Sequence, residues 1–197
     1  MNPAELNAWM AEHFTRSAFR LETLQSYEVA SDGSDYRRYL DGERTWTPER
    51  KQPWLDHLRS ERDRGLYRHR VRIVTRPVTP YTRYECEWGY EPNVAAGEDV
   101  RVLDLGEYPL SVELTSTDWW RFDWWLIENV ARERYVLGMS YEPDGQFRDA
   151  WIADKGTDTP PVAAFVAIRN LLWSAAEPFT SWWSRHGELH RDGARAA

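Results

Sequence analysis

Apolar residues recur at helical spacing in the first third of the chain. From Leu6 to Phe14 they fall on one face of a helix that Asn2 and Pro3 are suited to start, because asparagine caps helix N-termini and proline fits the first turn. Similar patterns follow after a break at residues 26–33. The helices expected in this part of the chain span residues 2–14, 34–40 and 48–64.

The middle of the chain predicts a strand, a helix and a second strand. Residues 67–75 are rich in β-branched side chains, which favour strands, and Pro80 is typical of the first turn of a helix. A second strand is expected over residues 100–105, and the segment 91–99 with its Gly97 is expected to be a connection. A strand, helix and strand at this short spacing predict a parallel crossover.

The last part of the chain predicts a hairpin and a final helix. Residues 134–141 and 146–153 flank the Pro-Asp-Gly sequence at 143–145, which is a strong turn signal. The aromatic run at 119–127 reads as another strand. A helix over residues 159–177 is too apolar to lie on the surface.

These patterns predict an α/β fold with a mixed central β-sheet flanked by helices. We expect a single domain over residues 1–187, with an N-terminal helical region at 1–65 and a flexible tail at 188–197. A length of 197 residues and 42% hydrophobic residues suit one domain with a substantial core.

Composition excludes several classes of protein. The formal net charge of −7 argues against broad contact with nucleic-acid backbones, which need a basic face. There is no apolar run long enough to span a bilayer and no secretory signal pattern, so we expect a cytoplasmic protein without membrane contact. The single cysteine, Cys86, and five scattered histidines predict no metal site, and no nucleotide-binding or nucleophile motif predicts a cofactor.

Several blocks resemble a known family. Residues 18–24, 71–75 and 81–98 resemble an uncharacterised actinobacterial family whose members are often encoded beside helix-turn-helix regulators. The order of elements is also similar to the terminal half of phospholipase-D-like sensor domains, whose enzymes use a His-x-Lys motif. No histidine here has a lysine two residues later, so the second resemblance implies a degenerate half without phosphodiesterase chemistry.

Three places carry candidate binding residues. The helix from Tyr81 to Trp88 presents carboxylates, an arginine and aromatic rings at a strand-to-helix junction, although it also reads as an ordinary amphipathic helix with an Arg83–Glu87 pair. Arg20 and Glu22 predict either a buried ion pair or a solvated helix end. The tryptophan run, which is the aromatic segment at residues 119–127, predicts one of two arrangements. It forms an exposed surface on which rings stack, or it packs in the core or at a subunit interface. The candidate residues are Arg20, Glu22, Arg76, Tyr81, Arg83, Tyr84, Glu85, Trp88, Asn93, Trp120 and Trp124.

Three functions stay open at this point. A non-catalytic regulatory or sensor module that binds a helix-turn-helix regulator or a small ligand is favoured, because recognisable catalytic motifs are missing. A hydrolase-like enzyme would instead use carboxylates as acid and base. A homo-oligomeric interaction protein, held by the tryptophan run, is the third. The carboxylates available to the enzyme are Glu85, Glu87, Asp104, Asp118 and Asp123.

Overall fold

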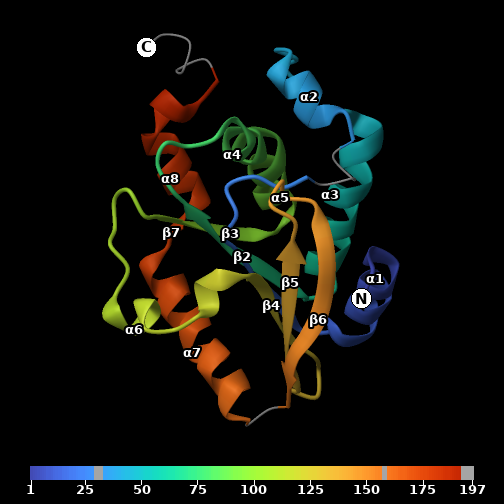
Figure 1. Cartoon of the computed structure of the whole chain (residues 1–197). Helices are drawn as coiled ribbons and strands as arrows, with labels where there is room; N and C mark the ends of the chain where they lie inside the picture. The colour runs from blue at the N-terminus through green and yellow to red at the C-terminus, as the bar shows by residue number, and fades with distance from the viewer. Residues whose placement is uncertain (29–32, 157–158, 192–197) are drawn as a thin grey trace.

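A computed structural model describes residues 1–28, 33–156 and 159–191 of the chain (Figure 1). Seven strands form one sheet in the order β6-β5-β4-β1-β2-β3-β7. The strands are β1 (Ser17–Glu22), β2 (Tyr67–Val74), β3 (Asp99–Asp104), β4 (Asp123–Glu128), β5 (Arg134–Tyr141), β6 (Phe147–Lys155) and β7 (Glu177–Pro178).

Helices lie on both sides of this sheet. The α-helices are α1 (Pro3–His13), α2 (Asp35–Leu40), α3 (Pro48–Asp63), α4 (Pro80–Tyr84), α5 (Glu91–Ala96), α6 (Val112–Thr115), α7 (Pro160–Ala175) and α8 (Phe179–Arg185). A π-helix, η2 (Glu85–Tyr90), joins α4 to α5, and two 3-10 helices are η3 (Trp119–Arg121) and η4 (Gly187–Leu189). This confirms the predicted α/β fold with a mixed sheet flanked by helices.

The sheet is mixed because its two halves are connected differently. Strands β1, β2 and β3 are parallel and are joined by helical crossovers, as the pattern over residues 67–105 predicts. Strands β4, β5 and β6 are antiparallel, and β5 and β6 form the predicted hairpin. The short β7 pairs antiparallel with the other edge of the parallel half.

The two faces of the central strands differ in chemistry. Phe19 and Leu21 of β1 and Val71 and Ile73 of β2 are buried in one apolar cluster with residues of α7. The alternate positions of these strands point to the opposite face, where α3, η2 and α5 lie. Figure 1 shows α7 well apart from the group formed by α2 to α5. The charged residues at those alternate positions therefore face the second helical layer.

Four sequence predictions need correction. The segment 91–99 is not only a connection, because Glu91–Ala96 forms α5 and Gly97, with φ 117°, ends it in the left-handed conformation. The aromatic run begins with η3, so its strand starts only at Asp123. The last long helix ends at Ala175, before β7 and α8. Residues 17–22, which carry the Arg20–Glu22 pair, form a strand and not a helix end.

The C-terminal segment is packed as far as it is described. Residues Gly187–Leu189 form η4, and the main-chain N–H of Arg191 donates to Glu87 at 2.7 Å. Residues 192–197 of the predicted flexible tail lie outside the described residues. Within the described ranges, every helix is too short or too polar to cross a bilayer.

Candidate functional site

Three buried arginines form a row along the centre of the sheet. Arg68, Arg70 and Arg72 occupy alternate positions of β2 and are 8%, 7% and 0% exposed. A buried guanidinium needs a charged partner, and each of the three has one. The partners are Glu61 for Arg68 at 2.7 Å, Glu22 and Glu98 for Arg70 at 2.8 and 2.6 Å, and Glu85 for Arg72 at 2.9 Å.

Glu22 is the centre of the network. The register of β1 on β2 places Arg20 beside Arg70, and the Glu22 carboxylate bridges the two arginines at 3.1 and 2.8 Å. The Tyr90 hydroxyl donates to the same carboxylate at 2.8 Å. Burial alone would raise the pKa of Glu22, but the nearby arginines outweigh it and hold this pKa at about 2. Glu22 is therefore ionised throughout the neutral range.

The pKa of Glu85 is shifted in the opposite direction. Burial raises its pKa from 4.5 to about 7, and Arg72 offsets this only in part. Its Oε2 atom lies 2.9 Å from Arg72 but at an angle that makes no hydrogen bond within the described chain. The sheet face thus presents two carboxyl groups, Glu22 and Glu85, that titrate in separate pH ranges.

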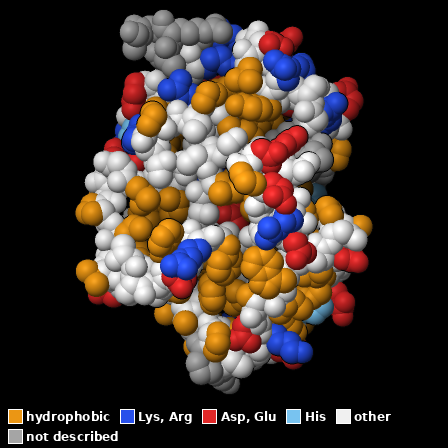
Figure 2. Space-filling model, viewed as in Figure 1, with side chains coloured by type: hydrophobic (Ala, Val, Ile, Leu, Met, Phe, Trp, Pro, Cys, Tyr) orange, Lys and Arg blue, Asp and Glu red, His pale blue; other side chains and the backbone are white. Residues whose placement is uncertain are grey.

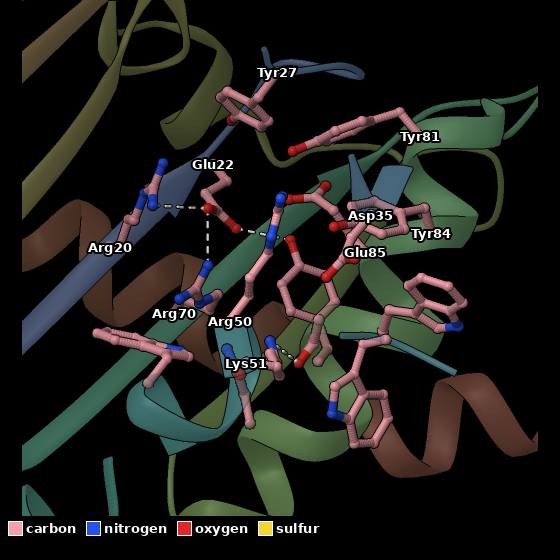
Figure 3. A pocket seen from close by; sticks show the side chains of 16 residues that line it. Arg20, Glu22, Tyr27, Asp35, Arg50, Lys51, Arg70, Tyr81, Tyr84 and Glu85 are labelled. Carbon is pink, nitrogen blue, oxygen red and sulfur yellow. Dashed lines mark hydrogen bonds and ion pairs between the residues drawn. The ribbon is translucent and has the colours of Figure 1, made fainter. Parts of the chain in front are cut away.

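A cleft of about 300 Å³ opens between this charged face and the helices (Figure 3). Of its lining residues, seven are aromatic, seven are charged, and the others are Asn93 and Gly89. None of the residues lining the cleft in the described ranges has an aliphatic side chain. The lining residues are Arg20, Glu22, Tyr27, Asp35, Trp46, Arg50, Lys51, Trp54, Arg70, Tyr81, Tyr84, Glu85, Trp88, Gly89, Tyr90 and Asn93.

The local sequence explains why the cleft has this lining. Thr79 caps α4 through a bond from the Thr82 N–H, and the chain then passes directly into the π-helix η2. Tyr81, Tyr84 and Trp88 pack against one another at ring-centroid distances of 5.8 and 5.9 Å. π-Helical turns are often found at functional sites because they redirect side chains. Here the η2 turn carries Glu85 to the floor of the cleft.

The cleft brings together most of the residues singled out from the sequence. Those that line it are Arg20, Glu22, Tyr81, Tyr84, Glu85, Trp88 and Asn93. The buried Arg20–Glu22 pair, one of the two alternatives left open, is present at 3.1 Å, and the alternative of a solvated helix end is wrong. The helix from Tyr81 to Trp88 is accordingly part of a cleft wall.

Four other candidates lie elsewhere. Arg76 pairs with Asp104 at 2.6 Å, and Trp124 is fully buried between Phe19 and the α7 side chains. Trp120 is 50% exposed on η3, and Arg83 is half-buried on α4, and neither lines the cleft. In place of the pair expected with Arg83, Glu87 lies 3.6 Å from Arg191. These positions do not take part in the candidate site.

Several lining residues were missed in the sequence. The alternation of arginines over residues 68–72 is a signal for Arg70, since a strand with arginine at every second position must bury or expose a charged row. Trp46, Trp54 and the basic side chains at 50 and 51 come from α3 and the loop before it. Nothing local links them to the strand residues, because only the tertiary fold brings them to the cleft.

One further cluster has the spacing of metal ligands. Within the described ranges, donor atoms of Asp104, Glu107 and His186 lie within 4.8 Å of one another. Both carboxylates already meet cations, since Arg76 binds Asp104 and Arg185 binds Glu107. A metal ion would have to displace these guanidinium groups. The cluster is therefore better described as an ion-pair network that fastens α8 to the end of β3.

Replacing Glu85 by glutamine is expected to flatten the pH dependence of stability. Because its folded-state pKa of about 7 exceeds the usual 4.5, the contribution of this group is complete below about pH 4.5 and is lost as pH rises to about 7. The free energy of unfolding should therefore fall less over this range in Glu85→Gln, by on the order of 1–3 kcal/mol. Urea titrations at several pH values measure the slope.

The matched control is Glu12→Gln, which changes an exposed carboxylate on α1. Its curve of stability against pH should run parallel to that of the unaltered protein. Parallel curves for Glu85→Gln as well would show that Glu85 does not titrate with a raised pKa in the folded state.

Comparisons with known proteins identify a family for the chain but no activity. No curated protein and no solved structure shows a significant match to it. A family model matches residues 4–184, which includes the whole charged sheet face and the helices around the cleft. This confirms the predicted relation to an uncharacterised family. Because the match covers most of its length, the chain belongs to the family described as "Domain of unknown function (DUF6879)".

Proposed function

We propose that this protein is a non-catalytic regulatory module whose cleft binds a small molecule. The observation that carries the proposal is the concentration of buried charge and aromatic surface around one opening. Clefts of roughly 300–1,000 Å³ with a few convergent polar groups are typical small-molecule sites. The cleft here, of about 300 Å³, has Arg20, Glu22 and Glu85 among its lining residues (Figure 3).

The network of charges supports binding rather than packing alone. Replacing a buried ion pair by apolar residues often leaves stability unchanged or improved, so such pairs are weak stabilisers. This chain nevertheless buries Arg70 with Glu22 and Glu98 on the face that opens to solvent at the cleft. Hydrogen-bond donors and acceptors that the fold holds in place at an opening favour ligand recognition, because their geometry is fixed before the ligand binds.

The proposed regulatory role includes a protein partner. The resemblance of residues 18–24 and 81–98 to a family encoded beside helix-turn-helix regulators makes such a regulator the expected partner. Coexpression of the protein with the regulator encoded next to it, followed by affinity purification, tests this part. Recovery of the two proteins as separate species, at micromolar concentration and with or without ligand, would remove the regulator from the proposal.

Filling the cleft is expected to abolish ligand binding without unfolding the protein. Among the described residues outside the backbone of its own helix, a Cβ at Gly89 would have only the Glu85 Cβ within 4 Å, at 3.8 Å, so Gly89→Leu adds bulk at a loosely packed point of the cleft lining. A ligand at one hundred times its Kd stabilises by about 2.7 kcal/mol, or roughly 5–10 °C in Tm for a chain of this size. Thermal-shift measurements with a metabolite library should show such a rise for the unaltered protein and none for Gly89→Leu.

Gly187→Leu is the matched control. In the part of the chain that the structure describes, no neighbouring heavy atom lies within 4 Å of a Cβ placed at Gly187, and this glycine is outside the cleft. The control should keep the full ligand-induced shift. A library without any stabilising compound, or equal shifts in both variants, would count against a ligand site in this cleft.

A carboxylate-based enzyme is the second candidate, and a specific observation favours it. Glu22, with a pKa of about 2, and Glu85, with a pKa of about 7, line the same cleft. Pairs of carboxyl groups whose pKa values differ in this way are common as the acid and base of hydrolases. In this alternative a protonated Glu85 donates a proton while Glu22 stays ionised. Mass spectrometry of a bound compound after prolonged incubation would reveal a product, and Glu85→Gln would prevent its formation.

A further inference from the structure

The wall of the cleft contains buried polar atoms without hydrogen-bond partners. In the described ranges these include Arg20 Nε, Glu85 Oε2 and Asn93 Oδ1. Asn93 is only 5% exposed, and its Nδ2 is already engaged with Glu98 at 2.8 Å, so its free oxygen has no other use in the fold. Native proteins satisfy nearly all buried polar atoms. Their residues line one cleft, but the atoms themselves have almost no accessible surface, so a ligand in the cleft reaches them with a small shift of these side chains.

The three atoms require a ligand that both donates and accepts hydrogen bonds. Arg20 Nε is a donor, whereas Asn93 Oδ1 and an ionised Glu85 are acceptors. An ionised carboxylate has only acceptor oxygens and could satisfy Arg20 alone. A hydroxyl group has one donor and two acceptor positions, so neighbouring hydroxyls can satisfy all three atoms.

The charges inside the cleft favour the same kind of ligand. Arg70 is neutralised by Glu22 and Glu98, and Arg20 shares Glu22. The guanidinium groups of Arg20 and Arg70 are therefore paired, and the charged side chains among the described lining residues, four basic and three acidic, mix both signs. Paired arginines and carboxylates still present N–H donors and lone pairs side by side, which is the pattern that hydroxyl groups match.

The aromatic surface fits a ring. Trp46, Trp54 and Trp88 line the cleft together with four tyrosines, and no aliphatic side chain lies among the described lining residues. Aromatic faces hold flat rings and the C–H faces of saturated rings, while their neighbours remain available for polar contacts. A volume of about 300 Å³ is at the lower end for small-molecule pockets, so one ring with its substituents fills it.

We propose that the cleft binds a hydroxyl-bearing ring, either a free monosaccharide or the ribose of a nucleoside. This inference rests on the ligand-binding function proposed above and adds the chemical class of the ligand. Hydroxyl groups of the ring contact Arg20, Glu85 and Asn93, and the face of the ring, or of an attached base, packs on the tryptophans that line the cleft.

Saturation-transfer NMR with defined probes tests the class. The probes are neutral hexoses and pentoses, adenosine and uridine, with dideoxyadenosine, benzoate and inorganic phosphate as comparison compounds without the neighbouring hydroxyls. We expect transfer to ring protons of a sugar or of both nucleosides. Free sugars that bind identify a monosaccharide site, and nucleosides that bind alone identify a ribose held together with its base.

Two cleft variants locate the binding. Asn93→Leu removes the free acceptor, together with the Nδ2 bond to Glu98, with little change of size. Trp46→Leu leaves that bond intact and removes one ring face from the cleft wall. Each should weaken binding at least about tenfold, the effect of 1.4 kcal/mol. Trp120→Leu, on a half-exposed tryptophan outside the cleft, should leave the affinity unchanged.

Each other result overturns the inference in a recognisable way. Binding of benzoate or phosphate alone, or equal binding of adenosine and dideoxyadenosine, would reject the hydroxyl-bearing ring but leave the ligand-binding function intact. Sugar binding that Asn93→Leu and Gly89→Leu leave unchanged would place the ligand elsewhere. No binding by any probe, while the metabolite library gives a stabilising compound, rejects only the class. If no probe binds in the NMR experiment and no compound of the library stabilises the protein, both the ligand class and the ligand-binding function are rejected.

Discussion

Replacing Arg70 by methionine is expected to be among the most destabilising single changes in the protein. The side chain joins two buried carboxylates, Glu22 at 2.8 Å and Glu98 at 2.6 Å. Methionine occupies similar space but leaves Glu98 with only Asn93 as a partner. Removing one member of a buried ion pair costs about 3–5 kcal/mol, because the other charge stays buried and uncompensated. Urea unfolding followed by tryptophan fluorescence measures this loss.

The matched control for Arg70→Met is Arg121→Met. Arg121 pairs with Asp118 at 3.0 Å, but both side chains are largely exposed, so the change should cost less than about 1 kcal/mol. The deficit of Arg70→Met should also shrink as pH falls from about 4.5 to about 2, because the unaltered protein then loses the stabilisation that goes with the lowered pKa of Glu22. A loss below about 1 kcal/mol at neutral pH would mean that the network contributes little to stability.

Trp124→Ala is expected to lower the free energy of unfolding by a similar amount, for a different reason. Trp124 is 0% exposed and packs on Phe19 and Phe165 at centroid distances of 5.2 and 4.9 Å. Truncating a buried tryptophan removes its transfer free energy and leaves a cavity, at a cost of about 3–5 kcal/mol. Chemical denaturation of the variant gives the value directly.

The neighbouring Trp120 supplies the comparison. It is 50% exposed on η3, and Trp120→Ala should change the free energy of unfolding by less than about 0.5 kcal/mol. Similar losses for the two variants would contradict the placement of Trp124 in the core and Trp120 on the surface. Light scattering on Trp120→Ala tests, in the same samples, whether this exposed ring holds an oligomer together.

The tryptophan run shows how far the sequence could be interpreted. A run of this kind predicts either a stacking surface or buried packing, and the amino-acid order alone leaves both open. In the structure Trp119, Trp124 and Trp125 are buried, while Trp120 is half-exposed. The difference arises because η3 turns the backbone before β4 begins, so adjacent side chains point to different environments.

The candidate site, too, could be predicted from the sequence only in part. Seven of its residues could be chosen from the sequence, because charged and aromatic side chains at a strand-to-helix junction are a recognisable local pattern. Tyr90 and Trp54 could not, since their role depends on how α3 and η2 pack over that face. The alternation of arginines marks Arg70, but only the register of β1 on β2 shows that it lies beside Arg20. Contacts between residues far apart in the chain have no local signal.

The sequence by itself determined the class of the fold, the parallel crossover, the hairpin and the family. The first three follow from periodicity, turn residues and composition, which are local properties of the chain. The family follows from the resemblance of residues 18–24, 71–75 and 81–98 and from the family model that matches residues 4–184. Tertiary structure alone decided that the arginines of β2 are buried and matched with carboxylates, and that Glu85 has a pKa of about 7 beside a permanently ionised Glu22. Burial and charge pairing set these properties, and both depend on which distant segments the fold brings together.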